Sequence, residues 1–114
     1  MAVVYKVCSE AEWAHAVCAG VYAGSIDDRR DGFIHLSSGS QLAGTLAKHF
    51  AGRPALVLIA LDAASLAGGL RWEPSRGGTQ FPHLYGDLAP GMALWVRPIA
   101  VDGDGRHIVP EDLP

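Results

Sequence analysis

Cysteine is scarce in this chain of 114 residues, and neither a long apolar run nor a basic block is present. The two cysteines, Cys8 and Cys18, match neither a zinc knuckle nor a redox Cys-x-x-Cys pair. Because free cysteine is usually buried, we expect each to pack as a small apolar group. The longest apolar run, residues 56–61, is too short to span a bilayer. The first residues show no charged segment followed by an apolar one, so we expect no signal peptide and a cytoplasmic location.

The charge balance limits the class of ligand. The formal net charge is -3, from 9 Lys and Arg against 12 Asp and Glu, with no basic cluster. A surface for long nucleic acids needs clustered Lys and Arg, so we do not expect one. A local site for one small anion or phosphate stays open. The sequence does not predict an oligomeric state.

The pattern of apolar residues predicts strands and helices that do not alternate regularly. Residues 3–8 indicate a strand, and Ser9 with Glu12 forms the capping box of a helix that ends near Gly20. Residues 21–30 are expected to form a loop. A continuous apolar strand over residues 55–61 is expected in the centre of a sheet. The other expected elements are a helix over residues 41–51 and strands over residues 33–37, 70–74, 81–85 and 93–99.

The irregular order and the strand-rich second half favour one fold class. They predict an α+β fold with a mostly antiparallel sheet and two main helices, as a single domain over residues 1–114. The apolar fraction of 49% and the charged fraction of 18% are typical of a globular domain.

Two histidines lie in matched strand settings. Because side chains alternate along a strand, Phe33, His35 and Ser37 should share one face of the strand. The segment 81–85 repeats the arrangement, with His83 between Phe81 and Tyr85. One strand histidine is more often a structural group than a reactive one, but two in matched settings strengthen a functional interpretation.

A third segment would add charged side chains to a cleft that these two strands are expected to line. Arg71 and Glu73 should share one face of the strand over residues 70–74, and Arg76 follows it. Arginine presents a fixed fork to phosphate or carboxylate. The Gly77-Gly78 pair lets backbone N–H groups approach an anion. Glu73 and Arg76 are equally consistent with a solvated ion pair.

A zinc site is the weaker interpretation of the histidines. His35, His49 and His83 would supply three ligands, but no pair has the His-x-x-x-His spacing, so no metal is expected. No P-loop, dinucleotide fingerprint or Gly-x-Ser-x-Gly elbow is present. A nucleotide-like or phosphorylated ligand fits the cleft residues best.

Several motifs in order resemble those of a bacterial family, domain-of-unknown-function family 952. The matching segments are Asp31-Gly32-Phe33-Ile34-His35-Leu36-Ser37, Gln41-Leu42, Lys48-His49-Phe50, Arg71-Trp72-Glu73-Pro74-Ser75-Arg76-Gly77-Gly78 and Phe81-Pro82-His83-Leu84-Tyr85-Gly86. The resemblance covers the chain from Tyr5 to about Ile99. It implies a fold similar to that of ADP-ribosyltransferases and tRNA 2′-phosphotransferases, with a split, curved sheet and a cleft for NAD or an NAD-derived substrate.

The resemblance also implies roles for single residues. His35 and Ser37 would bind the ribose, and Arg71, Arg76, Gly78 and Tyr85 would line the cofactor site. Glu73 and His83 are the catalytic candidates, although the surroundings of Glu73 do not match the transferase motif.

Three functions stay open at this point. The first is an enzyme of ADP-ribosyl or 2′-phosphate transfer. The second is a two-histidine phosphoesterase, for which His35-Leu36-Ser37 fits and His83-Leu84-Tyr85 departs at the hydroxyl residue. The third is a non-catalytic module that binds a small anion or a protein.

Overall fold

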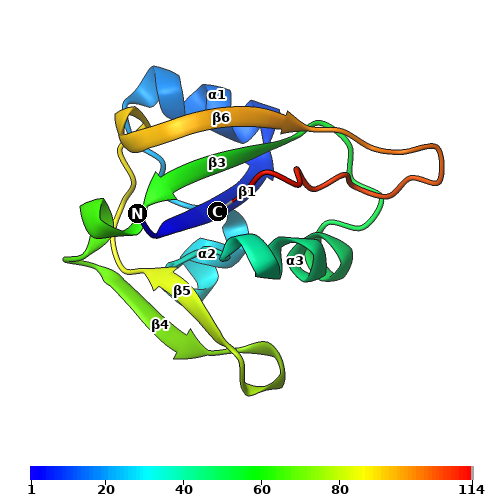
Figure 1. Ribbon diagram of the computed structural model, residues 1–114. Coiled ribbons are helices and arrows are strands. Elements are labelled where there is room, and N and C mark those ends of the chain that lie inside the picture. The colour runs from blue at the N-terminus through cyan, green and yellow to red at the C-terminus, as the bar shows by residue number, and fades with distance from the viewer. Residues whose placement is uncertain (114) are drawn as a thin grey trace.

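Two three-stranded antiparallel sheets form the framework of the protein (Figure 1). The computed structural model describes residues 1–113, apart from the side chain of Arg76. The strand order is β1-β3-β6 in the first sheet and β2-β5-β4 in the second. The strands are β1 (Val3–Ser9), β2 (Ile34–His35), β3 (Leu56–Asp62), β4 (Leu70–Pro74), β5 (Gln80–Leu84) and β6 (Ala93–Ile99).

The helices begin and end at residues with clear local signals. The helix predicted after the first strand is confirmed, because the Ser9 hydroxyl accepts the Glu12 N–H and the Glu12 carboxylate accepts the Ser9 N–H. Gly20 ends this helix in the left-handed conformation, with φ of 79°. The α-helices of the described chain are α1 (Glu10–Ala19), α2 (Ile26–Asp31) and α3 (Leu42–His49). The short 3₁₀ helices are η1 (Gly39–Gln41), η2 (Ala63–Leu66), η3 (Arg76–Gly78) and η4 (Pro90–Met92).

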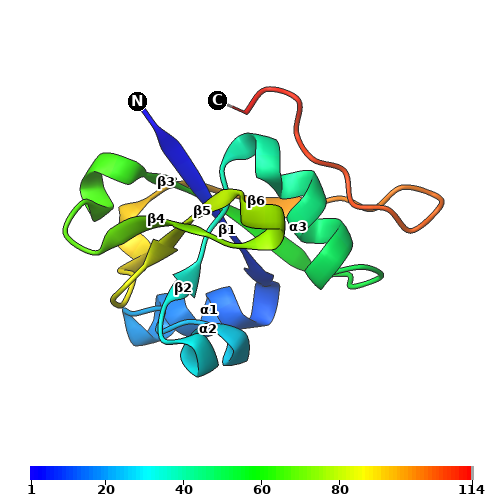
Figure 2. The same ribbon diagram turned by 90° about the horizontal axis from the view of Figure 1, so that it is seen from below.

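Strand β3 lies in the centre of the first sheet and is buried on both faces, as predicted from its continuous apolar sequence. Helix α1 covers one face, where Trp13 packs in a cluster with Ile59. Helix α3 covers the other face, where Leu42 and Leu46 pack in a cluster with Leu58. Figures 1 and 2 show the sheet between these two helices.

The second sheet meets the first at a backbone bridge between Tyr5 and Ser37. The Tyr5 N–H donates to the Ser37 carbonyl at 2.8 Å, and the Ser37 N–H donates to the Tyr5 carbonyl at 2.9 Å. Within the second sheet, His35 of β2 is the direct cross-strand partner of His83 of β5. The residues just before Ser37, His35 among them, are therefore held between the two sheets.

Three expectations from the sequence differ from the structure. The sequence predicts a loop over residues 21–30, but α2 occupies residues 26–31, capped at Ser25 by a second capping box. Cys18 is exposed because it lies on the outer face of α1, whereas Cys8 is buried as expected. The ladder of β2 includes only Ile34 and His35, because the chain leaves β5 to form the Tyr5–Ser37 bridge.

Within residues 1–113, no helix has both the length and the apolar character that crossing a membrane requires.

Candidate functional site

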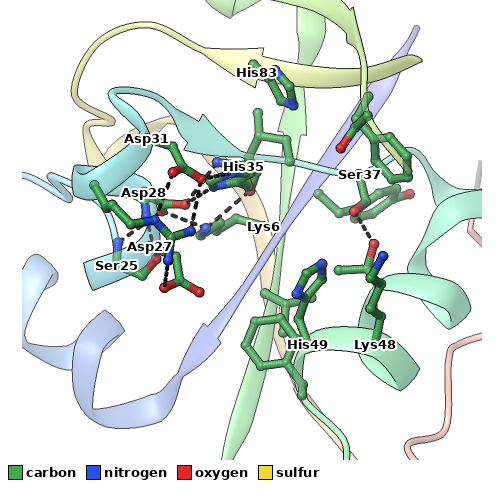
Figure 3. Close-up of a pocket in the computed structure, with 18 residues that line it drawn as sticks. Lys6, Ser25, Asp27, Asp28, Asp31, His35, Ser37, Lys48, His49 and His83 are labelled. Carbon is green, nitrogen blue, oxygen red and sulfur yellow. Dashed lines mark hydrogen bonds and ion pairs between the residues drawn. The ribbon is translucent and has the colours of Figure 1, made fainter. Parts of the chain in front are cut away.

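A pocket of about 350 Å³ lies where the two sheets meet. Its walls come from β1, α2, β2, α3 and β5 (Figure 3). A volume of this size is within the range of small-molecule sites. Figure 3 shows two groups of polar side chains, one around Asp28 and His35 and the other around Ser37, Lys48 and His49.

The buried carboxylate of Asp28 is the hub of the first group. Its side chain is 2% exposed. Oδ2 accepts from Lys6 Nζ at 2.7 Å and from the Ser25 N–H at 2.9 Å. Oδ1 accepts from the His35 N–H at 3.1 Å and lies 2.6 Å from His35 Nδ1. A carboxylate has about four acceptor positions, so all of those on Asp28 are used.

Lys6 is a buried cation within an otherwise apolar strand. It lies on β1 and is 4% exposed. Besides Asp28, its ammonium group donates to the His35 carbonyl at 3.2 Å. A buried charge is tolerated only when paired and hydrogen-bonded, so Lys6 and Asp28 depend on each other. Together they hold both the main chain and the ring of His35.

The environment of Asp28 favours its ionised form. Burial raises the pKa of the carboxyl group, but the hydrogen bond from His35 and the charge and hydrogen bond of Lys6 outweigh burial. The resulting pKa lies well below the usual range for aspartate.

This lowered pKa predicts acid sensitivity. Because the pKa is lower in the folded than in the unfolded chain, Asp28 adds stability above its unfolded pKa of about 3.9. That stability is lost as the pH falls through the folded-state pKa. We expect the side-chain ¹³C resonance of Asp28 to keep its ionised position at about pH 3.9, where free aspartate is half protonated. A titration midpoint at or above that pH would contradict the role given to Lys6 and His35.

The imidazole of His35 lies between two carboxylates. Nδ1 faces Asp28 Oδ1, and Nε2 lies 3.0 Å from Asp31 Oδ2. A carboxylate only accepts hydrogen bonds, so a ring with a proton on each nitrogen satisfies both contacts. The side chain is 38% exposed, which leaves its ring reachable from the pocket.

Asp31 is held by a neighbour on its own helix. Arg30 Nε donates to Asp31 Oδ1 at 2.9 Å, and Arg30 Nη1 donates to Asp27 Oδ1 at 3.2 Å. The hydrogen bond from Arg30 lowers the pKa of the Asp31 carboxyl. All three residues line the pocket, so its rim carries both signs of charge.

The second imidazole, His83, has a carboxylate on one nitrogen. His83 Nδ1 lies 2.9 Å from Glu73 Oε1, and the side chain is 7% exposed. The same Glu73 oxygen accepts from the Tyr85 hydroxyl at 2.6 Å. The hydrogen bond from Tyr85, followed by that from His83, lowers the pKa of Glu73. An ionised Glu73 requires the proton of His83 to be on Nδ1, which leaves Nε2 as the acceptor of a neutral ring.

The two imidazoles lie together. Their ring centroids are 5.7 Å apart, and the rings are nearly perpendicular. Phe33 stacks on His83 at 4.0 Å and also contacts the ring of His35 at 4.6 Å. Both histidines line the pocket.

The opposite wall of the pocket is formed by α3. The Ser37 and Thr45 hydroxyl oxygens are 2.9 Å apart. Lys48 and His49, in the last turn of α3, line the same wall and are exposed. Hydroxyl groups next to a lysine form a natural contact for a phosphate or carboxylate group.

The structure separates the predicted site residues into two sets. His35, Ser37 and His83 line the pocket. Glu73, Arg71 and Tyr85 form a cluster beside it, where Arg71 lies over the Tyr85 ring at 5.1 Å. Gly78 is exposed in the turn between β4 and β5. The side chain of Arg76 lies outside the described residues.

Reasoning from the sequence missed the residues that hold His35, which are Lys6, Asp28 and Asp31. Two signals point to them. Lys6 interrupts an apolar strand on the side of Val4 and Cys8, and Ser25-x-x-Asp28 has the spacing of a helix cap. Among residues 1–113, no three His, Cys, Asp or Glu side chains are grouped to hold a metal ion.

Comparison with known proteins gives a family without an assigned activity. The family model described as "Protein of unknown function (DUF952)" matches residues 7–96. The crystal structure of protein CC0527 from Caulobacter crescentus is 44% identical, with a TM-score of 0.89 and 93% of each chain covered. Its solution NMR structure is 45% identical, with a TM-score of 0.84 and coverage of 93% of this chain and 91% of that one. No curated protein matches the chain.

Proposed function

The chain belongs to the DUF952 family of proteins of unknown function, and we propose that it is an enzyme that acts on a nucleotide-like ligand in the pocket between its two sheets. The observation that carries this proposal is the pair of imidazoles, His35 and His83. Each has its Nδ1 at a carboxylate, and both line one pocket.

The two imidazoles differ in a way that suits an acid and a base. His35 has a carboxylate at each nitrogen, so it is the proton donor of the pair. Within residues 1–113 a carboxylate approaches His83 only at Nδ1, so its Nε2 is the acceptor. In phosphoester cleavage, His83 would take the proton of the attacking hydroxyl or water. The attacking oxygen would form a bond to phosphorus while the bond from phosphorus to the leaving oxygen breaks, and His35 would give that oxygen the Nε2 proton that now faces Asp31 Oδ2.

The remaining pocket residues support an anionic ligand. Lys48 and the Ser37–Thr45 hydroxyl pair would hold a phosphate, and Phe81 adds an aromatic surface for a base. Glu73 and Tyr85 would position the His83 ring rather than contact the ligand, because neither is among the pocket-lining residues.

Transfer of an ADP-ribosyl group or of a 2′-phosphate is the reaction class suggested by the resemblance to ADP-ribosyltransferases. In that interpretation the two antiparallel sheets correspond to the split sheet of those enzymes, and NAD or an NAD-derived molecule is a substrate. The 2′-phosphate reaction is better supported here, because it needs an acid and a base. ADP-ribosyl transfer needs a carboxylate at the ribose, whereas Glu73 is held by His83 and Tyr85.

The test is a panel of NAD, ADP-ribose, 2′-phosphorylated nucleotides and cyclic nucleotides. Binding is measured by calorimetry, and turnover by ³¹P NMR or chromatography. We expect His35→Gln and His83→Gln each to slow turnover by about 100-fold or more, since general acid–base groups contribute 10² to 10⁴. Binding should change much less than turnover.

The matched control is His107→Gln, whose imidazole contacts the Arg53 carbonyl at 2.7 Å and lines neither the pocket nor its rim. It should keep wild-type turnover. Binding without turnover of any compound would leave a non-catalytic binding module. If no compound binds, the pocket is not a nucleotide site and the proposal fails.

A further inference from the structure

A second, larger hollow lies next to the pocket. It has a volume of about 840 Å³ and lies between α1, the segment before α2, and the end of α3. Of the described residues predicted for the nucleotide site, none lines it. Its volume exceeds that of the first pocket and is ample for a small-molecule group.

The two hollows share part of their walls. Val7, Ser25, Asp27, His49 and Phe50 line both. These residues come from β1, the start of α2 and the end of α3, so the hollows meet in the gap between α2 and α3. Figure 3 shows His49 on the α3 side of the pocket and Asp27 on the α2 side.

The second hollow carries positive charge that no carboxylate within residues 1–113 pairs with. Arg29 and Arg53 line it, and neither takes part in an ion pair recorded among residues 1–113. Its two carboxylates are already used: Glu12 caps α1, and Asp27 pairs with Arg30. Arg53 lies over the Phe50 ring at 5.1 Å, which places a cation and an aromatic face at the junction.

We propose that the two hollows form one groove, and that the ligand is a dinucleotide that lies along it. One end lies beside His35 and His83, and the other is held by Arg29 and Arg53. This inference rests on the proposed nucleotide site, because it adds a second contact region to the same ligand. It names dinucleotides rather than mononucleotides as the substrate class.

Two kinds of dinucleotide share this chemistry, and the experiment distinguishes them. The probes are adenosine 5′-monophosphate, the phosphodiester dinucleotide pApA and the pyrophosphate-linked dinucleotide NAD. Calorimetry on the full chain should show pApA or NAD binding about 10-fold tighter than the mononucleotide or better, since one further hydrogen bond to a charged group is worth about that factor.

The double variant Arg29→Ala/Arg53→Ala should remove that preference and leave the affinity for the mononucleotide unchanged. Arg97→Ala is the matched control, because Arg97 is paired with Asp112 and lines neither hollow. Equal loss of affinity for all probes in the double variant, or no preference in the wild-type protein, would overturn the inference while the nucleotide site stands. Failure of every probe to bind would overturn both proposals.

Discussion

A variant with asparagine in place of Asp28 is expected to lose about 3–5 kcal/mol of its free energy of unfolding, the usual cost of removing one partner of a buried ion pair. Lys6 would keep its charge in a buried position with no carboxylate beside it. The asparagine amide would also point an N–H group at one of the groups that now donate a hydrogen bond to Asp28. Because small domains have only about 5–15 kcal/mol of stability, the variant should be close to unfolding. Urea denaturation followed by circular dichroism measures the loss.

Two further proteins make this result interpretable. Asp27→Asn changes the neighbouring carboxylate, which is 65% exposed and paired with Arg30, and should leave the stability almost unchanged. The double variant Lys6→Met/Asp28→Leu removes both buried charges and should recover most of the lost stability. A single Asp28→Asn variant as stable as wild type would show that the Lys6–Asp28 pair does not support the fold.

Replacing Gly24 with alanine should also be strongly destabilising, by about 2–6 kcal/mol. Gly24 has φ of 104°, a conformation that costs about 1–3 kcal/mol for other residues. A Cβ atom there would lie 2.7 Å from Asp28 Cβ, and relieving such overpacking costs about 1–3 kcal/mol more. The displaced residue is the one that holds His35, so ligand binding should weaken together with stability.

Gly32→Ala provides the matched comparison. Gly32 ends α2 with φ of 84°, but nothing lies within 4 Å of a Cβ placed there. Gly32→Ala should therefore lose only the free energy that the left-handed backbone conformation costs alanine, about 1–2 kcal/mol. Chemical denaturation of both variants separates the two contributions. Equal losses would mean that the contact between Gly24 and Asp28 is unimportant.

Much of the fold follows from local sequence signals. The limits of α1 follow from Ser9, Glu12 and Gly20, and the central position of β3 follows from its continuous apolar run. The pattern of apolar residues did not predict α2, because the charged sequence of this helix resembles that of a solvated loop. That helix has only six residues and depends on Ser25 and on the buried Asp28, which no pattern of apolar residues reveals.

The site was only partly predictable. Strand alternation places His35 and His83 on the faces of their strands that line the pocket, but their direct pairing depends on a register formed between segments far apart in the sequence. Lys6 and Asp28 are 22 residues apart and meet only after α2 packs against β1. Charge burial of this kind is a property of the whole fold, so single-sequence reasoning had little basis for it.

The stacking of Phe33 on His83 has a spectroscopic consequence. The two rings are 4.0 Å apart and 18° from parallel, so the ring current of Phe33 shields the protons of the imidazole. The His83 resonances should appear upfield of those of the other four histidines. A molecule that enters the pocket and separates these rings would move the His83 resonances back downfield. These resonances therefore report whether the pocket is occupied.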